Sequence, residues 1–146
     1  MKRFWRFQTE GMKYNRWREL TSDEIALEYK VEYRHIKPVY GDVFPTVEDF
    51  QKAVKKAKVM EVTPAIDRKI SYRSHTTSID DLESLVSTYK RPRDIQRIIK
   101  GYKENAKMPY PLVISRKGKL RVMGGNSRMD VAFILGFNPK VKVIEI

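Results

Sequence analysis

The chain has 146 residues, 41% of them hydrophobic, which is enough for one domain with a buried core. It has no cysteine and two histidines, which excludes disulfides, thiolate zinc sites, a cysteine nucleophile and a histidine-rich metal centre. Thirty Lys and Arg against eighteen Asp and Glu leave a net charge of +12, which favours polyanionic partners, nucleic acid first and nucleotides second. An ordinary protein of basic composition is the alternative. Because no apolar run suits a membrane span or a secretory signal, we expect a cytoplasmic protein.

The first twenty residues, "MKRFWRFQTEGMKYNRWREL", interleave basic and aromatic side chains. We call them the N-terminal arm. Such a segment can neutralise phosphates and stack on bases. The candidate nucleic-acid-binding residues are therefore Arg3, Trp5, Arg6, Arg16, Trp17 and Arg18. Alternatively, the aromatic side chains attach the arm to the domain while its charges face water.

Two capped helix starts follow the arm. Thr21 with Glu24 predicts a short helix, after which the turn residues of "RHIKPVYGDVFP" predict irregular chain. Thr46 with Asp49 predicts a second helix, over residues 47–58. The outer face of that helix is either simply solvated or part of a larger basic surface; it carries Lys52, Lys55, Lys56 and Lys58. With the arm, these elements form a predicted basic, aromatic and helical N-terminal extension over residues 1–64.

The remaining residues, 65–146, predict an α+β domain. Ser78 caps one helix and Pro92 suits the start of the next. The strands "LVIS" and "LRVM" flank a hairpin turn at Gly118. A third helix starts with Asn126 or Ser127 as its N-cap and closes at Gly136, and "KVKVIEI" forms the last strand. The predicted order is helix, helix, strand, strand, helix, strand.

The junction of strand and helix at Gly124–Arg128 predicts an anion site. Glycines let a ligand approach the backbone, and the first N–H groups of a helix point outward at its positive end. Ser127 adds a hydroxyl, and Arg128 adds a guanidinium that can grip a phosphate with two hydrogen bonds. The alternative is a tight turn with Asn126 as a simple cap. Asp130, one turn further on, is either a carboxylate that could serve phosphoryl transfer or a surface acid that stabilises the helix dipole, and the surface acid is the favoured reading.

The segment "MPYPLVISRKGKLRVMGGNSRMDVAFILGFNPKVKVIEI" resembles the ParB/sulfiredoxin family. In that family a strand, a hairpin, a second strand and a Gly-x-x-Arg helix start build a nucleotide-phosphate site, and Gly125–Arg128 matches that motif. The resemblance implies a small mixed sheet with flanking helices over residues 65–146. It also implies a nucleotide, ATP or CTP with Mg²⁺, at a site made of Gly124, Gly125, Asn126, Ser127, Arg128 and Arg97.

The chain departs from the family where chemistry would occur. Asn126 stands in place of the sulfiredoxin cysteine, so sulfinic-acid reduction is excluded. The Lys, Ser and Thr that sulfiredoxins place around ATP align with Asp94, Arg97 and Gly101, of which Arg97 alone suits phosphate. No helix-turn-helix region follows in this sequence, which argues against a partition function. Phosphoryl transfer would also need a metal and a general base.

The start, "MKRFWRFQTEG", resembles the capsid-targeting leader of internal head proteins in large tailed phages, which is cut after a Glu, here Glu10. These observations together predict a phage-encoded, DNA-associated protein that binds nucleotide or nucleic-acid phosphate. An ATP-dependent phosphotransferase or DNA-modification enzyme is the first alternative, with catalytic residues unassigned. A structural protein of the virion, in contact with other phage proteins, is the second.

Overall fold

The computed structural model describes residues 13–71, 73–88 and 94–146, apart from the side chains of residues 34 and 35. The elements in chain order are β1 (Trp17–Arg18), α2 (Ser22–Tyr40), α3 (Val47–Lys56), β2 (Lys58–Glu61), α4 (Pro64–Asp67), β3 (Ile70–Ser71), α5 (Ile79–Val86), α6 (Ile95–Lys103), β4 (Met108–Pro109), β5 (Leu112–Arg116), β6 (Lys119–Gly124), α7 (Asn126–Ile134) and β7 (Lys140–Glu145).

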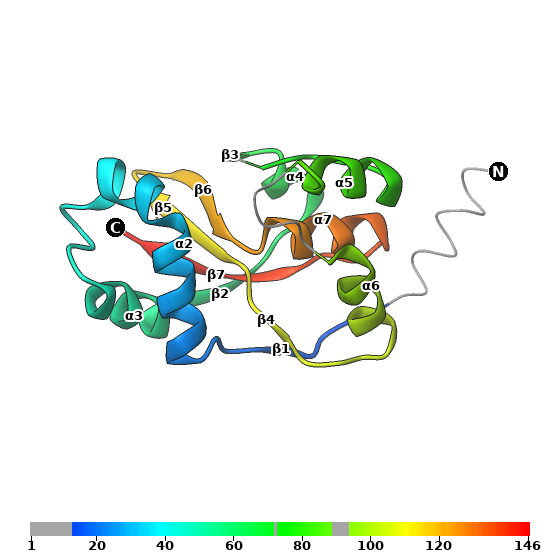
Figure 1. Ribbon diagram of the computed structural model, residues 1–146, viewed down its shortest axis with the longest axis horizontal. Helices are drawn as coiled ribbons and strands as arrows, with labels where there is room; N and C mark the ends of the chain where they lie inside the picture. Colours follow the sequence, from blue (N-terminus) through cyan, green and yellow to red (C-terminus); the bar gives the residue numbers. More distant parts are fainter. Residues whose placement is uncertain (1–12, 72, 89–93) are drawn as a thin grey trace.

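A mixed five-stranded sheet in the order β2-β7-β5-β6-β3 forms the centre of the fold, and β1 and β4 form a separate two-stranded parallel sheet. The hairpin of β5 and β6 is antiparallel, whereas β7 runs parallel to β5. Figure 1 shows α2 and α3 toward one end of the molecule and α5, α6 and α7 toward the other. The α+β class predicted from the sequence is therefore confirmed.

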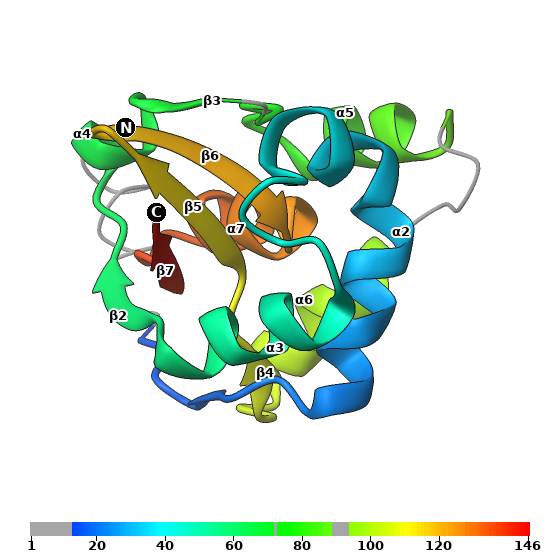
Figure 2. The same ribbon diagram turned by 90° about the vertical axis from the view of Figure 1, so that its left-hand side faces the viewer.

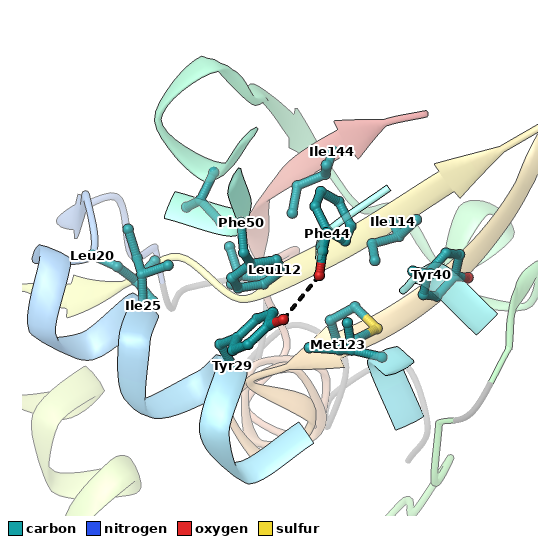
Figure 3. Close-up of a cluster of buried hydrophobic side chains, with 12 residues drawn as sticks. Leu20, Ile25, Tyr29, Tyr40, Phe44, Phe50, Leu112, Ile114, Met123 and Ile144 are labelled. Atoms are coloured by element: carbon teal, nitrogen blue, oxygen red, sulfur yellow. Dashed lines mark hydrogen bonds between the residues drawn. The ribbon is translucent and has the colours of Figure 1, made fainter. Parts of the chain in front are cut away.

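Alternate residues of β5 serve two different parts of the core. Leu112 and Ile114 join a cluster with Tyr29, Phe44 and Phe50 from α2, α3 and the loop between them (Figure 3). Val113, on the opposite face, packs instead with Met129 of α7 and with Val122, Val141 and Val143 of the neighbouring strands. This period of two places α2 and α3 over one face and α4 and α7 over the other, as Figure 2 illustrates.

The segment predicted as an N-terminal extension shares this core. β2 pairs with β7 from Lys58↔Val143 to Glu61↔Lys140, so it is an edge strand of the main sheet. Inside the cluster that α2 and α3 build on the sheet, the buried Tyr29 hydroxyl donates to the Phe44 carbonyl at 2.8 Å (Figure 3). Residues 13–64 thus supply the helical layer, α2 and α3, that covers one face of the sheet.

Several local predictions are confirmed. Thr21 and Glu24 form a reciprocal capping box, and Thr46 and Ser78 cap α3 and α5 with their hydroxyls. The hairpin turn has positive φ angles at Lys117 (50°) and Gly118 (78°), as a two-residue turn of this hand requires.

The length of α2 was predicted wrongly. The helix continues for 19 residues to Tyr40 and includes Pro38 in its last turns, where irregular chain was expected. Proline removes one hydrogen bond, but Ile36 (0% exposed) and Tyr40 (5% exposed) are buried on the same helix. The burial of these two side chains outweighs the local cost of the proline.

Candidate phosphate-binding site

The Gly124–Arg128 corner joins the end of β6 to the start of α7. Gly125 is the N-cap and has a left-handed backbone, with φ 84° and ψ 21°. The expectation that Asn126 or Ser127 caps this helix is therefore wrong, because both already lie in its first turn. As a glycine, Gly125 provides no side-chain cap of its own. The first-turn N–H groups of Asn126, Ser127 and Arg128 have no acceptor within the helix itself, which is the geometry of an anion site.

Side chains from distant parts of the sequence pack against both glycines. A Cβ on Gly124 would lie 2.6 Å from a carboxylate oxygen of Glu28, which belongs to α2. A Cβ on Gly125 would lie 2.7 Å from Nη2 of Arg128 and 2.7 Å from the Cβ of Pro111. The guanidinium of Arg128 is thus folded back over the corner, and an acidic side chain borders the same corner.

Arg73 forms hydrogen bonds with the side chains of both Asn126 and Asp130. Its Nη1 donates to Asn126 Oδ1 at 2.7 Å, and its Nη2 donates to Asp130 Oδ1 at 2.7 Å. Its Nε lies 2.6 Å from Asp67 Oδ1 of α4. The amide group of Asn126 in turn donates to the Ser74 hydroxyl at 3.2 Å. Both ends of the Asn126 side chain are therefore engaged inside the protein, which leaves its backbone N–H as its contribution to a ligand.

The expectation that Asp130 is a surface acid is wrong. Its side chain is 1% exposed, and its second oxygen accepts from Ser74 Oγ at 2.7 Å and from Thr76 Oγ1 at 2.9 Å. The Arg73 side chain is equally buried, at 1% exposure. A buried charge is stable only with partners of this kind. The network fastens residues 73–76 across the first turns of α7 and removes Asp130 from the candidate chemical groups.

The other predicted site residues differ in position. Ser127 is 9% exposed, so it is largely enclosed in the corner. Arg97 is exposed on α6, whereas Tyr102 is the α6 residue that contacts the corner, where its hydroxyl donates to the Arg128 carbonyl at 2.9 Å. Five residues of helix, about 7.5 Å, separate Arg97 from Tyr102. Burial raises the pKa of the Tyr102 phenol, so it remains a hydrogen-bond donor at neutral pH.

The described part of the N-terminal arm is packed on the domain. Trp17 makes edge contacts with Tyr14 and Tyr102 and stacks on Tyr110, with ring centroids 5.1, 5.8 and 6.1 Å away. Arg18 donates to both carboxylate oxygens of Glu24 at 2.7 and 2.9 Å.

The hydrogen-bonded ion pair with Arg18 is the main cause that lowers the pKa of Glu24 to about 2. Arg16 is exposed, and Arg3, Trp5 and Arg6 lie outside the described residues. The predicted nucleic-acid role of these six residues stays a prediction.

Glu28 and Arg73 are among the residues at the corner that the sequence did not indicate. Glu28 lies 96 positions before Gly124 on a helix whose pattern marks only its core face, and Arg73 lies in a segment without periodicity. The part of the chain that the structure describes holds no cluster of three or more His, Asp or Glu suited to a metal. A cation at this corner would therefore need phosphate oxygens and water among its ligands, as Mg²⁺ commonly has.

Comparison of the chain with protein-family models, with curated proteins and with solved structures finds no match. Among the described helices, none is both long and apolar enough to cross a bilayer.

Proposed function

We propose that the Gly124–Arg128 corner binds the phosphate group of a nucleotide or nucleic acid, and that the chain is a ParB/sulfiredoxin-like, phage-encoded protein associated with DNA. The observation that carries the proposal is the left-handed Gly125 at the start of α7, with the Arg128 guanidinium folded against it. The first N–H groups of a helix, a positive helix end and an arginine at one point favour a bound anion.

In this proposal, the contacts within the corner assign each residue a part in binding phosphate. The backbone N–H groups of residues 126–128 supply the donors, because the Asn126 side chain is engaged by Arg73 and Ser74. Arg128 supplies the charge. Gly124 and Gly125 remain glycine because Glu28, Pro111 and Arg128 occupy the space that a side chain would need. Arg97 contributes only to the positive electrostatic potential around the site, since it lies five residues along α6 from Tyr102, which contacts the corner.

Replacing Arg128 with alanine should weaken binding of ATP or CTP by about 1.5–3 kcal/mol, roughly 10- to 150-fold, the scale of a hydrogen bond to a charged group. Isothermal titration calorimetry with each nucleotide and Mg²⁺ would measure this. Arg68→Ala is the matched control, because it removes one exposed arginine near α4 and should leave affinity unchanged. Equal binding by wild type and Arg128→Ala would mean that the corner is only a turn.

A second candidate, phosphoryl transfer, is favoured by Glu28. Its carboxylate borders the same corner, where it could hold Mg²⁺ together with phosphate oxygens or accept the proton of an attacking hydroxyl. In this candidate the corner positions the nucleotide and Glu28 acts on the reacting group. Asp130, the carboxylate nearest in sequence, is unsuited because its oxygens bind Arg73, Ser74 and Thr76.

Glu28→Gln separates the two candidates because it keeps the shape of the side chain and removes its charge. If the protein is an enzyme, Mg²⁺-dependent release of product from ATP or CTP should fall by about 10²–10⁴-fold, while nucleotide affinity changes little. Product release would be followed by chromatography of the nucleotides. Wild-type protein that binds nucleotide without any turnover would exclude phosphoryl transfer and leave the binding proposal intact.

A further inference from the structure

Helix α6 has one buried and one strongly basic face. Ile95 and Tyr102 are buried in the cluster that α6 forms with α5 and α7, and Ile98 and Ile99 pack against it. Arg97, Lys100 and Lys103 lie three residues apart on the opposite face, and all three are exposed. We call these three residues the α6 basic face. From Arg97 to Lys103 it covers six helical rises, about 9 Å along the helix axis.

Neighbouring segments continue the positive charge. Lys107, four positions after the end of α6, is exposed. The Tyr14 hydroxyl bonds to the Ala106 carbonyl, and the Met108 N–H donates to the Arg16 carbonyl at 3.1 Å, so residues 13–16 run beside residues 106–108. Lys13 and Arg16, both exposed, therefore add charge at this end of α6. Figure 1 shows β1 and β4 along the lower edge of the view, between α2 and α6.

Acidic neutralisation of the α6 basic face is slight. Lys100 pairs with Glu104 at 4.0 Å, an exposed contact at the limit of an ion pair. Asp94 uses one carboxylate oxygen to accept from the Arg97 backbone N–H at 3.0 Å and so acts as the helix cap.

The lysine face of α3, which is Lys52, Lys55 and Lys56, has similar spacing but different surroundings. Glu48 and Asp49 lie in the first turn of α3, and Glu145 borders the groove beside Lys56 and Lys58. Three acids thus lie near the lysines of α3, whereas the acids beside the α6 basic face are Glu104, at the limit of an ion pair, and Asp94, which caps the helix. The two faces carry equal formal charge and make a natural pair for comparison.

We propose that the α6 basic face, continued by Lys107, Lys13 and Arg16, binds the phosphate backbone of duplex nucleic acid without reading its sequence. This inference rests on the proposed association with nucleic acid but does not require the Gly124–Arg128 corner. A cationic strip of about 9 Å meets several phosphates of a duplex, which carries one charge per roughly 1.7 Å of axis. The three side chains of the face are all cationic, with no aromatic ring on which an unpaired base would stack. The duplex backbone is thus the favoured partner over a single strand.

Two triple variants test this assignment. One is Arg97→Gln with Lys100→Gln and Lys103→Gln, and the other is Lys52→Gln with Lys55→Gln and Lys56→Gln. Each lowers the net charge by three at exposed helix positions, where glutamine is well tolerated, and thermal melts would verify that both fold. Fluorescence anisotropy with a 20-base-pair duplex of arbitrary sequence, over a series of salt concentrations, gives the affinity and its salt slope.

The α6 triple variant should reduce the slope of log K against log salt by up to about 2.7, since each neutralised phosphate contributes about 0.9. The α3 variant should keep the wild-type slope. Equal losses in both variants, or a loss confined to the α3 variant, would overturn the proposal, as would a wild type that does not bind the duplex. Nucleotide titration of wild type and Arg128→Ala reports on the corner, and the duplex slope of the two triple variants reports on the α6 basic face, so failure at one surface is distinguishable from failure at the other.

Vesicles of anionic lipid provide the competing polyanion. The apolar side of α6 is buried in the core, so the helix has no free apolar face to insert into a bilayer. We expect weak vesicle binding that is equal in the two triple variants. The nucleic-acid proposal would be refuted if the wild type does not bind the duplex and only the α6 variant loses vesicle binding. That result would assign the surface to a membrane.

Discussion

Replacing Arg73 with alanine should lower the free energy of unfolding by about 3–5 kcal/mol, the usual cost of removing one partner from a buried ion pair. The guanidinium is 1% exposed and touches Asp67, Asn126 and Asp130 at 2.6–2.7 Å. Its removal leaves the buried carboxylate of Asp130 with hydroxyl partners alone and adds a cavity beneath the start of α7.

Urea unfolding followed by circular dichroism would measure this loss. Arg68→Ala is the control, because it removes an exposed arginine five positions earlier and should change stability by less than about 0.5 kcal/mol. Arg73→Lys should fall between the two, since one ammonium cannot reach three partners in the geometry of a planar fork. A loss below about 1 kcal/mol in Arg73→Ala would show that the network is not a structural support.

The Arg73 network also links the start of α7 to neighbouring parts of the fold. Arg73 ties α4 through Asp67 to α7 through Asp130, and it fixes the side chain of Asn126 at the first turn. The three N–H groups that would face a ligand are thereby oriented before the ligand arrives, which reduces the entropy cost of binding. Loss of Arg73 should therefore weaken binding at the corner in addition to lowering stability.

The elements that could be predicted from the sequence are those defined by local contacts. Thr21, Thr46 and Ser78 start helices because each hydroxyl accepts from an N–H three residues later. The hairpin depends on Gly118 and its neighbour alone. Alternation along β5 and the position of Gly136 after α7 are equally local. The helix, strand and turn order of residues 78–146 followed from such signals, with the short strand β4 as an addition.

The parts that could not be predicted depend on contacts between distant positions. Most charged residues lie at the surface, and Asp130 was therefore expected there. In the structure it is buried because Arg73, 57 positions away in the sequence, pairs with it. Glu28 reaches the corner only because α2 packs beside β6. Trp17 looks like a stacking residue in the basic arm, yet its ring lies among Tyr14, Tyr102 and Tyr110. Pairing of this kind leaves no periodic pattern along the chain.

Gly125→Val tests the second structural requirement of the corner, the left-handed glycine. A β-branched residue at φ 84° is strained, and its Cβ would lie 2.7 Å from both Pro111 and the Arg128 guanidinium. Strain of about 1–2 kcal/mol for the backbone and about 1–3 kcal/mol for the crowding should together cost roughly 2–5 kcal/mol of stability. Pro111 cannot move aside without moving its backbone. The flexible Arg128 side chain must therefore relieve the clash by leaving the corner. Nucleotide affinity should therefore fall at least as far as in Arg128→Ala.

Gly118→Val separates backbone strain from the loss of the corner. Gly118 has nearly the same left-handed angle, φ 78°, but a Cβ there would meet nothing within 4 Å. This variant should lose only the backbone part of the stability and should bind nucleotide as the wild type does. Calorimetric titration and urea unfolding of the two valine variants, side by side, measure both quantities. If Gly125→Val folds and binds nucleotide with the affinity of Gly118→Val, the close approach of Arg128 to Gly125 has no part in recognising phosphate.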